Sequence, residues 1–446
     1  MIPRGAGFSG AANPPSTADT YLLQDPVRLV VWGRLLAILL PLLLYTGSLA
    51  NDFLIDDETI VSSNIRLAPG QWPLEVFRRP EQFADFTLPY NRPVTNLSYW
   101  VDARLWNRQP IGFHLTNWVI HAVTTLLTFE LAPGLTADPV LGLLAAILFA
   151  AHPMHTESVD VVQGRTDLLA TLFALLSLLA MRWCLFAIGS WQALAAGAVS
   201  LVGLGGALLA KEIAVTWPVL AAGLWWVKPG PRGPATRLGM FLVFPIPGFA
   251  MAERYLYLPS VGFCLLAATL FRRALLPGSG PVVQVPAVTL LATLVIAYTA
   301  TIQVRTAQWT DPVEVFEAMA GRTPTSLFVQ SKLGLEYLKA GRTPDAVGAM
   351  LRARDLEPAN PVAWNNLGAA LAQSGRLAEA RHAYERAIAL NARYAKTYEN
   401  LAQVLFALGD PIGARAASRT ARTLYAAWQN PQGRPDAQPA PTPAGR

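Results

Sequence analysis

Residues 360–391 read NPVAWNNLGAALAQSGRLAEARHAYERAIALN, and the pattern of this stretch returns on both sides of it at an interval of 34 residues. Each unit has two segments of helical periodicity, a turn that contains glycine between them, and small residues where two helices would touch. The pattern therefore predicts three helical hairpins in a row. The positions in register are Leu333, Leu367 and Leu401, then Gly341, Gly375 and Gly409, then Ala346, Ala380 and Ala414, and finally Ala353, Ala387 and Ala421.

A 34-residue period of this kind is that of the tetratricopeptide repeat, or TPR. The three repeats begin near residues 327, 361 and 395, so the predicted array covers 327–428. Such arrays form a concave surface that binds a peptide or a protein partner. The repeats contain no catalytic constellation, so we expect any chemistry elsewhere in the chain.

The composition of the whole chain is that of a membrane protein. Apolar residues make up 53% of its 446 residues, charged residues only 14%, and the mean hydropathy is +0.33, whereas soluble domains carry about 25% charge. The net charge of +6 is spread thinly, so no nucleic-acid partner is expected. We expect an all-α chain with a transmembrane helix bundle at 27–304, a linker at 305–326, and disordered tails at 1–26 and 429–446.

Hydrophobic runs of roughly spanning length predict up to nine membrane helices. The first run, at 28–49, could also be a cleaved signal peptide, but its length and position fit a retained span better. The runs at 139–151, 213–227, 238–250 and 258–271 are short for a span. The other runs are 111–131, 167–187, 191–209 and 282–302.

The positions of arginine and lysine predict the orientation in the membrane. Basic residues gather at 28–34, 228–237 and 272–273, so these segments are expected in the cytoplasm. The long loop at 51–110 and the repeats then lie on the other face, in the periplasm of a bacterial inner membrane or in the endoplasmic reticulum lumen of a eukaryote. Within the loop, apolar residues spaced three and four apart from Val94 to Leu105 predict a helix that lies flat at the interface or packs on the bundle.

Charged residues close to a bilayer are costly and therefore indicate function. Several of them, from loops far apart in sequence, converge on the predicted non-cytoplasmic face. Carboxylates and cations together suit a phosphate-bearing substrate and a proton transfer. The candidate residues are Asp56, Asp57, Arg92, Glu157, Arg165, Lys211, Glu212, Glu253 and Arg254.

Two histidines stand in the same region, and His152, His155 and Glu157 raise the question of a zinc site. In one tight loop these side chains face a single metal poorly, so no metal site is predicted there. We favour hydrogen bonds at a helix end for the histidines and a phosphate contact for Arg165.

A series of motifs runs through the chain in a definite order. The motifs are Asn51 to Glu58, Tyr90-Asn91-Arg92-Pro93, Phe113-His114-Leu115-Thr116-Asn117, His152 to Glu157, Gly164-Arg165-Thr166-Asp167, Lys211-Glu212 and Glu253 to Ser260. In this order, and followed by tetratricopeptides, they resemble the transmembrane-and-TPR protein O-mannosyltransferases and their bacterial relatives, which have the GT-C glycosyltransferase fold. The resemblance runs from about residue 45 to residue 428.

The resemblance implies an integral-membrane, inverting transferase that moves a mannose-like sugar from a polyprenyl-phosphate lipid to a protein hydroxyl. The family's acidic pair maps onto Asp56 and Asp57, with Asp56 as the catalytic base and Asp57 orienting the loop, and Glu157 is the alternative base. The other candidate residues would bind substrate, among them Arg92, His152 and His155. A divalent cation, Mg²⁺ or Mn²⁺, is left open as a cofactor, and the interval between Trp226 and Glu253 is shorter than in relatives.

Two other functions stay open at this point. One is a membrane-anchored TPR adaptor without catalytic activity. The other is a transferase that acts on a glycan or lipid acceptor instead of a protein. Activity with a polyprenyl-phosphate sugar separates the first from the rest, and the identity of the acceptor separates the second.

Overall fold

The computed structural model describes residues 26–54, 57–61, 67, 73–77, 91–211, 214 and 253–429, and every element in these ranges is helical. The all-α fold class is therefore confirmed. The chain divides into two compact units, one formed by residues 1–52 and 91–306 and the other by 53–90 and 307–446. The long loop thus groups mainly with the repeats, where we expected it in the transmembrane domain.

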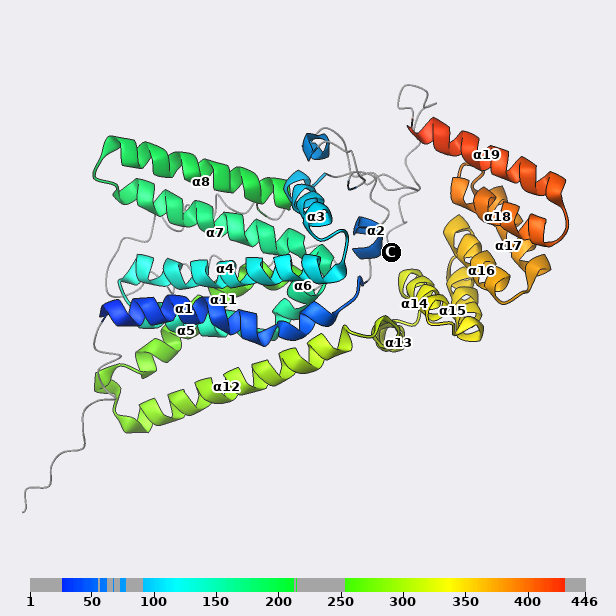
Figure 1. The fold of residues 1–446 in the computed structure, drawn as a ribbon. Coiled ribbons are helices and arrows are strands. Elements are labelled where there is room, and N and C mark those ends of the chain that lie inside the picture. The colour runs from blue at the N-terminus through cyan, green and yellow to red at the C-terminus, as the bar shows by residue number, and fades with distance from the viewer. Residues whose placement is uncertain are drawn as a thin grey trace, which may run out of the picture. The chain divides into compact units, whose positions relative to one another are not determined.

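The first unit is a helix bundle (Figure 1). Short connections at 137–138, 187–189 and 275–280 join three pairs of consecutive long helices. The long helices are α1 (Pro26–Leu44), α4 (Pro110–Thr136), α5 (Pro139–Ala150), α7 (Arg165–Phe186), α8 (Ser190–Ala210), α11 (Tyr257–Ala274) and α12 (Pro281–Gln308). Shorter elements are η2 (Thr46–Ala50), α3 (Pro93–Leu105), η5 (Pro153–His155), α6 (Thr156–Asp160), η6 (Val162–Gly164), η8 (Glu253–Leu256) and η9 (Pro277–Ser279).

Five helices among the described residues are long and apolar enough to cross a membrane. A sixth span results if α5 and the segment Pro153–Asp160, which meet at a bend of 52°, are counted as one. The helix α4 is not among these five, although its 27 residues cover the expected run at 111–131. The expected runs at 213–227 and 238–250 lie outside the described residues, so the count of nine stays a prediction.

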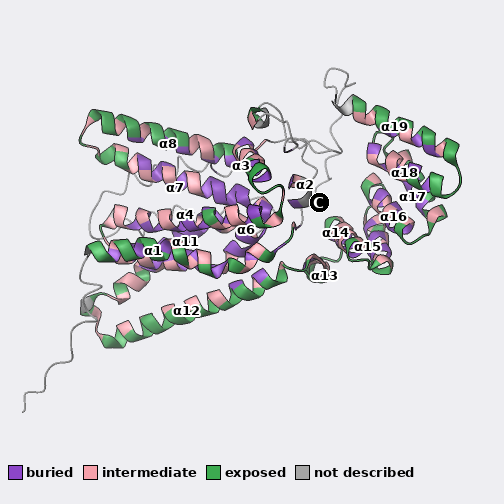
Figure 2. Cartoon of the chain, viewed as in Figure 1, coloured by how far each residue is buried: buried purple, intermediate pink, exposed green. Residues whose placement is uncertain are grey.

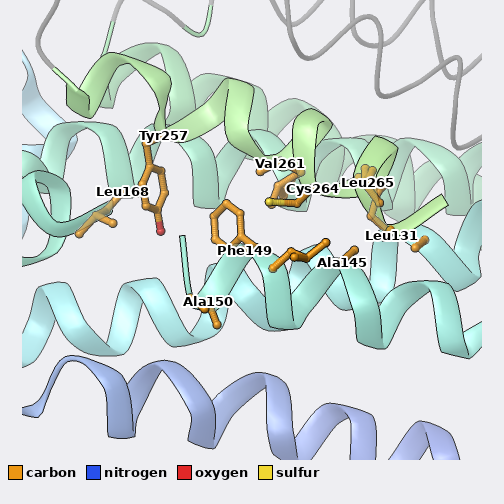
Figure 3. Packing of buried hydrophobic residues seen from close by; sticks show 14 of the residues in the cluster. Leu131, Ala145, Phe149, Ala150, Leu168, Tyr257, Val261, Cys264 and Leu265 are labelled. Carbon is orange, nitrogen blue, oxygen red and sulfur yellow. The ribbon is translucent and has the colours of Figure 1, made fainter. Parts of the chain in front are cut away.

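The core of the bundle is centred on α5, which packs against α1, α4 and α11. Leu144, Leu148 and Phe149 are buried there. Figure 3 shows Phe149 facing the side chains of α11, among them Tyr257 and Cys264. Each fully buried Leu or Phe contributes roughly 1.5–3 kcal/mol where water is the alternative. Inside a bilayer close packing takes over that role, so α5 holds the position of the polar segment that follows it.

The helix α12 contacts the bundle mostly near its C-terminal end. There Tyr298 packs against the core and Ile302 is fully buried. In the most apolar stretch of α12, by contrast, only 6% of the residues are buried within the protein. Figure 2 shows most of α12 as exposed. An exposed apolar helix of this length suits lipid contact.

The second unit contains the predicted repeats as six helices. The glycine of each turn has a positive φ, which is 74° at Gly341, 77° at Gly375 and 82° at Gly409, a conformation that side chains other than glycine rarely adopt. The helices are α14 (Leu327–Lys339), α15 (Thr343–Leu356), α16 (Pro361–Gln373), α17 (Leu377–Leu390), α18 (Ala395–Ala407) and α19 (Pro411–Gln429).

The residues placed in register by the sequence form the core of the repeats. Leu333, Leu367 and Leu401 are all buried, and so are the two sets of alanines. The expected linker at 305–326 is not extended, because it includes a further helix, α13 (Pro312–Arg322), whose Phe316 is fully buried against the first repeat. Two short segments, α2 (Asp57–Val61) and η4 (Pro73–Phe77), complete the described part of this unit.

Candidate functional site

One end of the helix bundle collects polar and charged side chains from six elements. The N-terminus of α7 and the C-terminus of α8 meet there, because α7 and α8 form an antiparallel pair. The C-terminus of α12 reaches the same end, where the Arg305 guanidinium donates to the Pro153 carbonyl at 3.0 Å and the Thr306 hydroxyl donates to an Asp160 carboxylate oxygen at 2.8 Å. The chain therefore leaves the bundle toward the repeats at this end.

Lys211, directly after α8, forms a buried ion pair with Asp167 in the first turn of α7. Its Nζ lies 2.5 Å from the Asp167 Oδ1, and both side chains are less than a tenth exposed. The same ammonium lies 4.4 Å from the ring centroid of Tyr255. The partner of Lys211 is thus a residue 44 positions earlier in the chain. Glu212 lies outside the described residues.

Arg254, in η8, holds the second ion pair of this end. Its Nη1 lies 3.3 Å from the Glu157 Oε1 and 3.1 Å from the Gln163 Oε1, and its backbone N–H donates to the Glu157 Oε2 at 3.2 Å. Both partners lie in the turn between α5 and α7. The Arg254 side chain remains 20% exposed, so part of the guanidinium can still reach a ligand. The side chain of Glu253 is outside the described part of the chain.

The two pairs and Arg92 form one group, which we call the charge cluster: Arg92, Glu157, Asp167, Lys211 and Arg254. Burial lowers the pKa of Lys211, Asp167 opposes this shift, and the nearby positive charges of Arg92 and Arg254 lower the pKa further. The positive charges of Arg92 and Arg254 therefore repel that of Lys211, while Asp167 pairs with Lys211 and Glu157 pairs with Arg254. An anionic ligand would relieve this repulsion.

Arg165, the first residue of α7, does not face an open site. Its side chain is fully buried and packs over the rings of Tyr99 and Phe113. The guanidinium forms an ion pair with Asp102 at 2.5 Å, and it donates to the Asn117 Oδ1 and the Phe113 carbonyl at 2.7 Å each. Because these protein acceptors already bind the guanidinium, we leave Arg165 out of the proposed phosphate contacts.

Of the residues around Arg165, Tyr99 and Asp102 come from the helix predicted at 94–105, which is α3, and Phe113 and Asn117 come from α4. The polar side of α3, with Thr95, Asn96, Tyr99 and Asp102, is buried against the bundle, whereas Leu105 is exposed. Of the two alternatives for this helix, the buried polar side agrees with packing on the bundle. In the apolar stripe, Val94 packs against the core, whereas Val101 and Leu105 are exposed. Sequence reasoning missed Asp102, although polar residues recur on α3 at helical spacing and indicated a second buried side.

The two candidate histidines contact protein groups. The His152 Nδ1 accepts from the Met154 N–H at 3.4 Å, at the start of η5. The His155 Nε2 lies 2.7 Å from the Ser260 hydroxyl, which itself donates to the Tyr257 carbonyl. His155 is therefore the donor to Ser260. In the described ranges no group of three His, Cys, Asp or Glu side chains is arranged to hold a metal ion.

The acidic loop belongs to the other compact unit and is described by itself. Asp57 is fully buried and begins α2, where its Oδ2 accepts from the Leu54 N–H at 3.2 Å. Asp57 is thus the first residue of a short helix. The contact agrees with a loop-orienting role for Asp57, and Asp56 lies outside the described residues.

Comparison with known proteins supports both parts of the chain. Residues 331–389 match the family described as tetratricopeptide repeat, and residues 370–409 match a second TPR family. Among solved structures, a crystal structure of MamA matches with 26% identity and a TM-score of 0.24, covering 25% of this chain and 66% of that one. At this score the likeness carries no weight in the argument.

Curated relatives are named protein O-mannosyl-transferases. Xenopus laevis tmtc2 is 34% identical over 172 residues, 36% of this chain and 20% of the relative. Human TMTC2 is 33% identical over 153 residues, which are 33% of this chain and 18% of the relative. Drosophila melanogaster Tmtc1 is 29% identical over 250 residues, or 53% and 28%. The match spans about a fifth to a quarter of the relatives' length, and with the TPR matches it confirms the resemblance to the transmembrane-and-TPR family.

Proposed function

We propose that this chain is a membrane glycosyltransferase that moves a mannose-like sugar from a polyprenyl-phosphate donor to Ser or Thr hydroxyls of a protein. The observation that carries the proposal is the charge cluster at one end of an apolar bundle, in a chain whose relatives are named O-mannosyl-transferases. GT-C architecture, inversion and the dependence on polyprenyl phosphate are parts of the proposal, drawn from the family resemblance. The site would face the periplasm, or the lumen in a eukaryote.

The cations of the cluster would bind the donor phosphate. Arg254 is the strongest candidate because its side chain is partly exposed and its guanidinium can donate two parallel hydrogen bonds to a phosphate. Arg92 and Lys211 would add positive charge beside it. As the sugar leaves, negative charge grows on the phosphate, and cations fixed in a site with little water stabilise that charge.

A hydroxyl acceptor needs a base within hydrogen-bond reach. We propose Asp56 for this role, as the family resemblance implies, with Asp57 holding the loop through its contact with the Leu54 N–H. General-base catalysis typically contributes about 10²–10⁴-fold. Glu157 is the alternative base, but Arg254 binds both of its carboxylate oxygens, which makes a supporting role for Glu157 the simpler interpretation.

The repeats would recruit the acceptor protein. The chain leaves the bundle for the repeats at the end that carries the charge cluster, so a bound acceptor would be kept near the site. Deleting residues 327–428 should then lower the modification of a protein substrate while leaving the turnover of a short peptide largely unchanged. Equal loss of both activities would indicate that the repeats serve folding instead.

The decisive experiment measures sugar transfer by purified protein in lipid nanodiscs, from a synthetic polyprenyl-phosphate mannose to a Ser/Thr-rich protein. Arg254→Gln should raise the KM for the donor at least tenfold and leave the KM for the acceptor nearly unchanged. Arg272→Gln is the matched control, because Arg272 forms a similar partly exposed pair with Asp138 at the opposite end of the bundle. Equal donor dependence in both variants would exclude the cluster as the donor site.

The same assay decides between the proposal and its alternatives. Asp56→Asn should remove nearly all transfer in a protein that remains folded. If the unmodified chain transfers no sugar from any polyprenyl-phosphate donor, it is an adaptor. If transfer occurs only to a glycan or lipid acceptor, the acceptor part of the proposal is wrong and the donor part stands.

A further inference from the structure

The last helical hairpin of the repeats differs from the two before it in what it exposes. Phe406, at the end of α18, is 73% exposed, Leu408 in the turn is 42% exposed, and Ile412, at the start of α19, is 81% exposed. At the equivalent positions 34 residues earlier, the second repeat has Ala372, Ser374 and Ala378. Large apolar side chains thus replace small ones at one tip of the array.

The second helix of this hairpin, α19 (Pro411–Gln429), carries a line of arginines without acids. Arg415, Arg419 and Arg422 are exposed, and α19 contains no Asp or Glu from Pro411 to Gln429. In the second repeat the residue equivalent to Arg419 is Glu385, which forms an ion pair with Arg381 at 2.7 Å. Like charges four residues apart destabilise a helix slightly, so the third repeat has exchanged a favourable pair for an unfavourable one.

Helical geometry places Ile412 and the three arginines on one side of α19. At 3.6 residues per turn, Ile412, Arg415, Arg419 and Arg422 fall within an arc of about 80°. Ala414, Ala417 and Ala421, on the opposite side, are buried at 7%, 8% and 4% exposure. Figure 2 shows the outer side of α19 as exposed. We call the exposed set the terminal face: Phe406, Leu408, Ile412, Arg415, Arg419 and Arg422.

We propose that the terminal face docks the repeats on a membrane surface that contains anionic phospholipids. A terminal repeat needs a polar outer side for solubility, but mixed charges such as those of α17 would provide it, and solubility does not explain three exposed large apolar residues. Arginines beside protruding aromatic and aliphatic side chains are the composition of interfacial segments, in which cations bind headgroups and apolar side chains enter the headgroup boundary.

Because the repeats are covalently linked to the membrane bundle, a weak affinity of the terminal face for the membrane is sufficient for docking. Only 18 residues separate the end of α12 at Gln308 from the start of α14 at Leu327. Even fully extended they would span no more than about 65 Å, so the repeats remain close to the bilayer that the bundle occupies. Each arginine near an anionic surface adds roughly a fivefold gain in binding, which makes about a hundredfold for three. Tethering at a high effective concentration then favours the docked state.

The test uses the full chain in nanodiscs, with Cys184→Ala and Cys264→Ala to remove the native thiols. A polarity-sensitive fluorophore is attached at Ile412→Cys, and at Ala378→Cys as the matched position of the second repeat. The discs contain nitroxide-labelled acyl chains as quenchers. Their lipid is either phosphatidylcholine alone or phosphatidylcholine with roughly 30% phosphatidylglycerol, which is anionic. Docking would quench the label at 412 in the anionic discs and leave the label at 378 unquenched.

Two further measurements fix the cause. The triple variant Arg415→Gln, Arg419→Gln and Arg422→Gln should lose the quenching, since its affinity for the surface would fall about a hundredfold. The triple variant Arg342→Gln, Arg376→Gln and Arg381→Gln removes the same charge from ion-paired sites and should keep it. Salt at about 0.5 M should release the docked state in the unchanged protein, which makes the test independent of how well any variant folds.

Several results would overturn the proposal. No quenching at 412 in anionic discs, or equal quenching at 378, would show that the terminal face does not dock. If the fluorescence of the label at 412 changed only when polyglutamate was added, the terminal face would bind an acidic polypeptide and not a membrane. None of these results bears on sugar transfer, so the proposed function stands or falls separately.

Discussion

Replacing Arg165 by methionine should destabilise the bundle strongly, because Arg165 has a structural role and is not one of the proposed phosphate contacts. The side chain is fully buried and binds Asp102, Asn117 and the Phe113 carbonyl. Methionine fills most of the volume but donates no hydrogen bond, so two neutral acceptors and one carboxylate lose their donor. Each unsatisfied buried acceptor costs roughly 1–3 kcal/mol, and removing one partner of a buried ion pair typically costs about 3–5 kcal/mol.

This loss should be visible as a lower melting temperature. For a unit of about 250 residues, each kcal/mol shifts the melting temperature by roughly 2–4 °C, so the expected decrease is about 6–20 °C. Thermal unfolding in detergent, followed by size-exclusion fluorescence, measures it. Arg254→Gln is the comparison, because that side chain is partly exposed and a partly exposed pair contributes at most about 1 kcal/mol.

The pH dependence of the same variant provides a second signature. Burial already raises the pKa of Asp102, and Arg165 is the largest influence that lowers it. Without Arg165 the pKa of the folded state rises further above that of the unfolded chain. A carboxyl group of this kind favours folding while it is protonated and stops doing so as the pH rises through its folded pKa. The destabilisation should therefore be larger at pH 8 than at pH 5. A decrease below about 3 °C, or an equal decrease in Arg254→Gln, would refute the structural role of Arg165.

Three further predictions concern the charge cluster, the repeats and the topology. Burial and neighbouring cations lower the pKa of Lys211, so use of the donor should decline with rising pH, at a midpoint below the ordinary lysine value of about 10.4. Lys211→Arg should move this midpoint upward. An unchanged midpoint would exclude Lys211 as the titrating group. In the repeats, Gly368→Ala would bring a Cβ within 2.7 Å of Tyr384 and should cost about 1–3 kcal/mol relative to Gly321→Ala, which meets no atom within 4 Å; denaturant unfolding measures the difference, and equal stabilities would contradict it. A reporter that is active only in the cytoplasm should stay silent when fused after Gln429, and a strong signal would reverse the proposed orientation.

The sequence determined the repeats almost completely. A 34-residue period places the same contact between the same two helices in every unit, so leucines, alanines and glycines in register already define the packing. The glycine turns at 341, 375 and 409 and the buried leucines at 333, 367 and 401 follow from that local rule. The long apolar helices of the bundle were predictable for a similar reason, because spanning length and hydropathy are properties of one segment at a time.

Only the tertiary structure decided which charged side chains meet. Lys211 and Asp167 are 44 positions apart, and Arg254 lies 97 positions from Glu157; hydropathy says nothing about the rotation of one helix against another, and that rotation brings them together. Arg165 shows the reverse case. Its motif and its cost near a bilayer indicated a ligand contact, yet the packing of α3 supplies Asp102 as its partner. A cation close to the bilayer needs a group of opposite charge beside it. The fold determines whether that group belongs to a substrate or to the protein itself.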